Sequence, residues 1–151
     1  MYKRILVPID GSRASNLGLN EAMRLAKQHK ARLRLLHVVD VFIVTPTLDG
    51  GRYVAEIQKT FRAEGARLLK KAAALAHRRG LAVDCVMLEI IGGRAAEIIV
   101  GQARKWRADI IVIGTHGRRG VSRLVMGSDA EQVVRTSPVP VLLVRSKTVM
   151  R

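Results

Sequence analysis

The sequence predicts a single α/β domain in which a mostly parallel sheet is covered by helices on both faces. Short runs of Ile, Leu and Val alternate with longer segments whose apolar residues recur every three or four positions. Strands that alternate with helices are joined by right-handed crossovers, and this makes them parallel. The chain has 151 residues, 48% of them hydrophobic, which suffices for one core. No linker, repeat or low-complexity tract interrupts it, so residues 1–151 are expected to form one domain.

The first half of the chain begins with a buried strand over Arg4–Ile9, which ends in a turn. A helix is expected from about Ser12 to Lys30, with a stripe of small residues that lets it sit close to a sheet. The second strand is expected over Ala31–Val39. Asp40–Arg52 is expected to be a loop because it contains one proline and two adjacent glycines.

The middle of the chain contains the clearest helical pattern, which runs from Val54 and stops at Gly80. A third strand is expected over Leu81–Ile91, and its Cys85 is interpreted as a buried core thiol. The turn that follows leads into a helix over about Arg94–Arg107, and a fourth strand is expected over Ala108–Ile113.

The last part of the chain is expected to begin with a loop over Gly114–Met126. The Ser-x-x-Glu spacing of Ser128 and Glu131 is typical of a capping box, so a short helix should start there. Pro138 should end that helix, and Val139–Arg145 is the fifth expected strand.

Composition and charge restrict the classes of function. Apolar runs such as Ile110–Ile113 are far shorter than the ~20 residues of a membrane-spanning helix. The amino terminus lacks the apolar core of a signal peptide, and a single cysteine fits a reducing compartment, so the expected location is the cytoplasm. The net charge of +15 attracts polyanions, but the basic residues are spread along the chain, and the favoured interpretation is a solvated basic surface.

Unusual residues follow two of the expected strands. Asp10 lies just after the first strand, and a glycine-rich segment over residues 114–120 follows the fourth. In an open parallel sheet, ligands bind outside the carboxyl ends of the strands, where the strand order reverses. A carboxylate there can accept hydrogen bonds from ribose, and glycines let backbone amides approach phosphates. The amino end of the Ser128 helix adds free N–H groups that favour an anion.

Glycines in this region also form a longer motif. Gly114, Gly117, Gly127 and Ser128 match the pattern Gly-x2-Gly-x9-Gly-Ser/Thr. With the opening segment over residues 5–12 and the closing segment over residues 138–144, the chain resembles the universal stress protein family, in the subgroup that binds ATP. The resemblance covers nearly the whole chain. It implies a Rossmann-like three-layer sandwich whose five-stranded parallel sheet has the order 3-2-1-4-5.

The same resemblance implies roles for individual residues. Asp10, in the matching segment that also contains Pro8, would bind ribose, and the backbone around Val39 would border adenine. Gly114 would lie near ribose. The residues that would hold the phosphates are Gly117, Gly127 and Ser128. Arg118 is a candidate phosphate contact, with a solvated loop residue as the alternative. Asp129 would need to turn away from a triphosphate or be bridged to it by a divalent cation such as Mg²⁺ or Mn²⁺.

The predicted function is therefore a universal stress protein that binds an adenine nucleotide, ATP, and acts as a sensor or regulator. No Walker A pattern, nucleophile elbow or His-Glu-x-x-His motif occurs, so we expect no catalytic residues and at most slow hydrolysis. A slow nucleotide hydrolase and a basic nucleic-acid-binding protein are the alternatives. The strand Val139–Val144 is apolar on both faces and lies at a sheet edge in the implied order, which predicts a homodimer through this strand.

Overall fold

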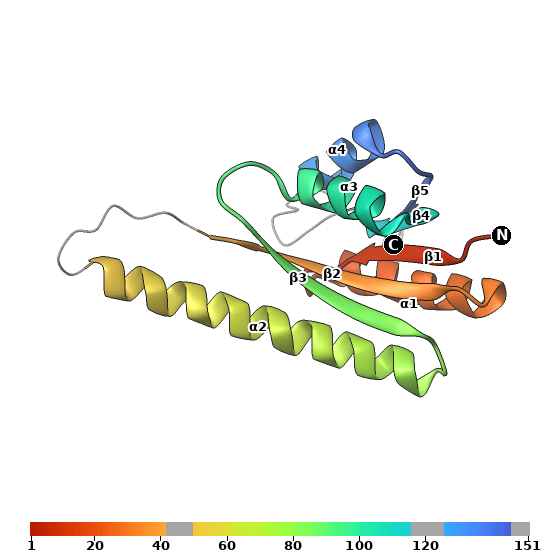
Figure 1. Cartoon of the computed structure of the whole chain (residues 1–151), viewed down its shortest axis with the longest axis horizontal. Helices are drawn as coiled ribbons and strands as arrows, with labels where there is room; N and C mark the ends of the chain where they lie inside the picture. Colours follow the sequence, from red (N-terminus) through yellow and green to blue (C-terminus); the bar gives the residue numbers. More distant parts are fainter. Residues whose placement is uncertain (42–49, 116–125, 146–151) are drawn as a thin grey trace, which may run out of the picture.

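Nine elements alternate strictly between strand and helix in the structure, a computed structural model that describes residues 1–41, 50–115 and 126–145 (Figure 1). They are β1 (Arg4–Pro8), α1 (Arg13–His29), β2 (Arg32–Asp40), α2 (Gly50–Arg78), β3 (Val83–Ile90), α3 (Ala95–Trp106), β4 (Ile110–Gly114), α4 (Ser128–Thr136) and β5 (Val141–Val144). None of the helices in these ranges is long and apolar enough to cross a membrane.

All neighbouring strands are parallel, and the sheet has the order β3-β2-β1-β4-β5. Both the α/β class and the strand order 3-2-1-4-5 are thereby confirmed. The chain builds one half of the sheet outward from β1 to β3 and then returns to β4 on the other side of β1. The reversal lies between β1 and β4, where a crevice opens at the carboxyl ends of the strands.

Each face of the sheet is covered by two helices (Figure 1). On one face, α1 and α2 pack their apolar stripes on alternate residues of β1 and β2, such as Ile5 and Leu33. On the other face, α3 and α4 pack on the intervening residues, such as Leu6 and Leu36. These four strand residues have no exposed surface, as a strand buried on both faces requires.

Helix α1 approaches β4 so closely that no side chain fits between them. A Cβ atom added at Gly114 would lie 2.5 Å from the carbonyl carbon and oxygen of Ala14. A Cβ atom at Gly18 would lie 3.2 Å from the backbone nitrogen of Gly114. The small-residue stripe of α1 therefore packs backbone against backbone at the end of β4.

Two local expectations were wrong. The segment expected to be a loop up to Arg52 ends earlier, because α2 begins at Gly50. Glycine is tolerated there because its entropic cost is greatest in the middle of a helix and Gly50 and Gly51 lie at its start. Cys85 is exposed rather than a core thiol, because β3 is an edge strand and α2 covers only part of its side chains.

The variant Gly114→Ala should lose about 1–3 kcal/mol of unfolding free energy. Its added Cβ atom would meet backbone atoms of Ala14, which cannot rotate away as a side chain can. Urea unfolding followed by circular dichroism measures the loss. The matched control is Gly101→Ala in α3, where nothing lies within 4 Å of the added atom. That variant should gain roughly 0.5–1 kcal/mol because alanine favours helix. Equal midpoints for the two variants would contradict the close packing of α1 on β4.

Candidate functional site

A cavity of about 460 Å³ lies at the carboxyl ends of the central strands. Its volume falls within the roughly 300–1,000 Å³ typical of small-molecule sites. Its walls come from the ends of β1, β2 and β4 and from the first turns of α1, α3 and α4. The side chains and backbone that line it include Pro8, Ile9, Asp10, Ser15, His37, Val38, Asp40, Ile90, Gly93, Arg94, Ile99, Gly114, Gly127, Ser128 and Asp129.

Asp10 is held in place by the turn that joins β1 to α1. Its Oδ1 accepts a hydrogen bond from the backbone N–H of Ser12 at 2.9 Å. Its own backbone N–H donates to Oγ of Ser15 at 3.0 Å, and Ser15 is buried. Ser12 caps α1 by accepting from the N–H of Ser15. The turn is therefore fixed by side-chain caps, and it places the Asp10 carboxylate at the cavity wall.

The amino end of α4 lacks the predicted capping box. The helix begins at Ser128 as expected, but its N-cap is Gly127, which has no side chain to accept from the first N–H groups. In a capping box the Ser128 hydroxyl would accept from the backbone N–H of Glu131, but that N–H donates to the carbonyl of Gly127. The capping box was the wrong interpretation because Ser128 lies inside the first turn rather than before it. The end of α4 consequently faces the cavity with backbone donors and a positive dipole.

A second helix end reaches the same cavity. Arg94 is the N-cap of α3, its side chain makes no capping hydrogen bond, and it lines the cavity beside Gly93. Among the described lining residues, Arg94 is the only Lys or Arg, and the same lining includes the carboxylates of Asp10, Asp40 and Asp129. Sequence reasoning missed Arg94. The adjacent glycines Gly92 and Gly93 were the sequence feature that could have indicated it. Both have positive φ and form the turn between β3 and α3.

His37 also lines the cavity and was missed, because it belongs to no ligand-spacing pattern. Its Nδ1 lies 2.8 Å from the carbonyl oxygen of Ile9 and ties β2 to the end of β1. The ring fits under α2 at Gly65, where a Cβ atom would come within 2.6 Å of it. The gap that Gly65 leaves in the apolar stripe of α2 is therefore the space that His37 occupies.

The structure brings most of the predicted site residues together. The ones that line the cavity are Pro8, Asp10, Gly114, Gly127, Ser128 and Asp129. Val39 is buried and does not line it, whereas its neighbours Val38 and Asp40 do. Gly117 and Arg118 lie outside the described residues, as does most of the expected loop Gly114–Met126. No group of three or more His, Cys, Asp or Glu side chains that could hold a metal ion occurs in residues 1–41, 50–115 and 126–145.

Comparison with known proteins gives a consistent result. Residues 1–145 match the model of the universal stress protein family. The chain is 37% identical over 147 residues to a universal stress protein of Methanocaldococcus jannaschii, covering 96% of this chain and 83% of that one. It is 35% identical to a family protein from Burkholderia pseudomallei, with a TM-score of 0.77 and coverage of 96% and 97%. A universal stress protein from Lactobacillus plantarum, 25% identical, has a TM-score of 0.83 and coverage of 95% and 98%.

Two more distant structures of the same fold contain nucleotides. One is a universal stress protein in complex with cAMP, 23% identical, with a TM-score of 0.62 and coverage of 97% and 98%. The other is a family protein from Arabidopsis thaliana with AMP bound, 16% identical, with a TM-score of 0.70 and coverage of 97% and 93%.

Proposed function

The chain belongs to the universal stress protein family, and from that premise we propose that it binds ATP and acts in the cytoplasm as a sensor or regulator rather than a catalyst. The observation that carries the proposal is the cavity at the point where the strand order reverses. A carboxylate on one wall and an uncapped helix end on the other match the two polar ends of a nucleotide.

Asp10 is the proposed ribose ligand. Its carboxylate lies at the cavity wall and accepts from the N–H of Ser12, and a carboxylate is a charged acceptor suited to ribose hydroxyls. Gly127 and Ser128 at the start of α4 are the proposed phosphate-site residues. The N–H of Gly127 donates to the carbonyl of Thr115 at 2.6 Å, so its proposed role is to leave room for the phosphate, because it has no Cβ atom. The proposed donors are the backbone N–H groups of the first turn of α4 from Ser128 on, which no side chain caps. Arg94 adds a guanidinium on the α3 side, where it can offset the charge of the phosphates.

The bound cAMP and AMP of the two distant relatives support an adenine nucleotide as the ligand class. Asp129 would repel a triphosphate from the first turn of α4 unless a cation lay between them. Carboxylates and phosphates together are ordinary ligands of Mg²⁺. We therefore propose that a divalent cation, Mg²⁺ or Mn²⁺, enters with the nucleotide and that Asp129 or Asp10 faces it.

The variant Asp10→Ala should weaken ATP binding by roughly 1–3 kcal/mol, because ribose hydroxyls lose a charged acceptor. Gly127→Val should remove most of the affinity by placing a branched side chain where the phosphate approaches α4. Isothermal titration with ATP and Mg²⁺ measures both effects. Gly101→Val, in open space on α3, is the control that should bind like the wild type. Dissociation constants that are equal in all four proteins would remove this cavity as the ATP site.

Multiple turnover of ATP should be absent or marginal, below the roughly 1–1,000 per second of ordinary enzymes. The described lining residues include no lysine, and the sequence has no Walker A pattern or nucleophile elbow. Phosphate release under multiple-turnover conditions measures the rate. An ordinary enzymatic rate that persists at constant specific activity through repeated purification would establish the hydrolase alternative instead.

The proposed assembly is a homodimer through β5, which lies at the edge of the sheet. The carbonyls of Pro140 and Val144 accept from β4, through the N–H groups of Ile111 and Thr115. Because backbone groups alternate in direction along a strand, the N–H and C=O of Val141 and Leu143 point away from β4. A second copy related by two-fold symmetry would pair with these groups and cover both edges.

The variant Leu143→Pro should convert the dimer to a monomer, because proline removes an outward N–H while the bonds to β4 remain. A charged residue at Leu142 or Val144 should act in the same direction. The side chains of Leu142 and Val144 pack on the core beneath α1 and α2, and that of Leu143 packs on the core beneath α3 and α4, so every one of these variants also loses packing. Sedimentation equilibrium gives the mass, and circular dichroism checks that the variant is folded. A wild-type monomer across micromolar concentrations, or a folded Leu143→Pro dimer, would rule out this interface.

A further inference from the structure

The edge of the sheet opposite the cavity gathers a dense set of positive charges. In a parallel sheet all strands start at one edge, and the helices between them end there. Helices α1, α2 and α3 therefore end at one side of the molecule, beside the starts of β1, β2, β3 and β4, and this is the side of the N-terminus (Figure 1). Backbone hydrogen bonds join these segments: the N–H of Arg32 donates to the carbonyl of Lys3, and that of Asp109 to the carbonyl of Arg4, both at 2.8 Å.

We call the exposed cations of this edge that make no ion pair or side-chain hydrogen bond in the described part of the chain the basic pole, which leaves out Arg79 because it donates to Asn20. All of them are exposed, and within the described residues none has an ion pair or a side-chain hydrogen bond. The basic pole consists of Lys3, Lys27, Lys30, Arg32, Arg78, Arg104, Lys105 and Arg107.

The carboxylates of the same edge do not neutralise these charges. Among the described residues of the segments 2–4, 26–32, 76–84 and 103–110, the acidic side chains are Asp84 and Asp109. Asp109 accepts from the backbone N–H groups of Lys3 and Arg4, both at 2.8 Å. These bonds, that of Lys3 first, lower the pKa of Asp109 below its usual range. Asp109 therefore hydrogen-bonds to backbone N–H groups and not to a side chain of the basic pole.

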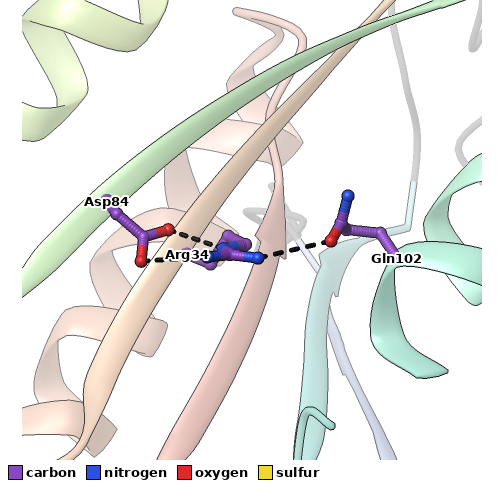
Figure 2. A network of polar contacts seen from close by, with 3 residues as sticks. All are labelled: Arg34, Asp84 and Gln102. Atoms are coloured by element: carbon purple, nitrogen blue, oxygen red, sulfur yellow. Dashed lines mark hydrogen bonds and ion pairs between the residues drawn. The ribbon is translucent and has the colours of Figure 1, made fainter. Parts of the chain in front are cut away.

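Asp84 is engaged by a cation that is not part of the pole (Figure 2). Nε and Nη2 of Arg34 donate to its two carboxylate oxygens at 2.6 and 3.2 Å. Nη1 of Arg34 donates to Gln102 at 3.4 Å, and the guanidinium lies 4.6 Å from the centre of the Trp106 ring. Asp109 is thus bonded to backbone N–H groups and Asp84 to Arg34, and the eight cations of the basic pole are exposed to solvent.

Helix dipoles explain part of this clustering but not its size. Basic residues are favoured in the last turn of a helix because the end carries about −0.5 of a charge. Three such ends supply about −1.5, against eight full positive charges. Lys3 and Arg32 lie at strand starts, where no helix dipole favours them. The excess charge is therefore available to an external polyanion.

We propose that the basic pole binds the phosphate backbone of a nucleic acid duplex without reading its sequence. The pole extends across the starts of four strands and two helix layers, about 15 by 20 Å at ordinary spacings. A duplex presents about 12 phosphates over 20 Å of its axis, so a broad basic face matches it better than it matches a single phosphoryl group. Base stacking is not expected, because aromatic residues make up 3% of the chain and Trp106 lies against Arg34.

An anionic membrane is the competing polyanion, and the pole fits it less well. Stable attachment to a membrane needs an inserted apolar group or lipid chain in addition to basic charge. Among the exposed large apolar side chains of the described residues, Met1 is the one next to the pole. The duplex proposal does not depend on ATP, because the nine residues of β2 separate the pole from the cavity by about 26 Å.

A test removes three pole charges that come from three different helices, in the variant Lys27→Gln/Arg78→Gln/Arg104→Gln. The matched control, Arg52→Gln/Lys59→Gln/Arg67→Gln, loses the same charge from exposed positions on α2. Those positions lie about 16–39 Å before Arg78 along the helix axis. Glutamine keeps helix propensity, and circular dichroism checks that both variants are folded.

The probe is a 20-base-pair DNA duplex of mixed sequence, and fluorescence anisotropy measures binding from low to physiological salt. For the wild type, log K should fall with log salt with a slope of about −4, which corresponds to about half the pole cations in contact. The pole variant should reduce that slope by about 1–3, depending on how many of the three cations touch phosphates, and weaken binding roughly tenfold, while the control and Asp10→Ala should bind like the wild type. Equal weakening of both charge variants, no wild-type binding, or binding to phosphatidylserine vesicles without binding to the duplex would each overturn the proposal.

Discussion

The structure depends on one backbone contact, between α1 at Gly18 and Ala14 and the end of β4 at Gly114. Interiors are packed so densely that an added Cβ atom 2.5 Å from a carbonyl must displace the helix or the strand. The contact sets how α1 lies on the sheet, and α1 in turn positions the turn that holds Asp10. The wall of the cavity is thus fixed by two glycines that have no side chain to offer a ligand.

A glycine in a binding motif can therefore be required for packing as well as for ligand binding. Gly114 belongs to the pattern that resembles the nucleotide motif, and it lines the cavity. The packing of α1 would require glycine at this position even in a protein that bound nothing. Gly127 is different, because it lies at the N-cap of α4 and leaves the first N–H groups of that helix without a side-chain acceptor. Of the two, Gly127 is the stronger indicator of an anion site.

Because all strands run in the same direction, the two edges of the sheet carry different charged groups. Helices begin at the carboxyl edge, where α3 and α4 turn their positive ends toward the cavity. They end at the opposite edge, where the basic side chains of Lys27, Arg78 and Arg104 accumulate. One topological feature therefore places the cavity at one edge of the sheet and the basic pole at the other. The proposed nucleotide site and the proposed duplex site therefore share no residues.

The sequence alone determined the order and type of every element, because each apolar period is a local property of the chain and crossovers of this length make parallel sheets. It also indicated Asp10, Gly127 and Ser128 as cavity residues. Only the tertiary structure decided the place of Arg94 in the cavity lining, the fit of His37 beneath Gly65 and the convergence of the basic pole. These depend on which distant segments meet, and a charge spread evenly along the chain becomes a patch only when the helix ends share one edge of the sheet.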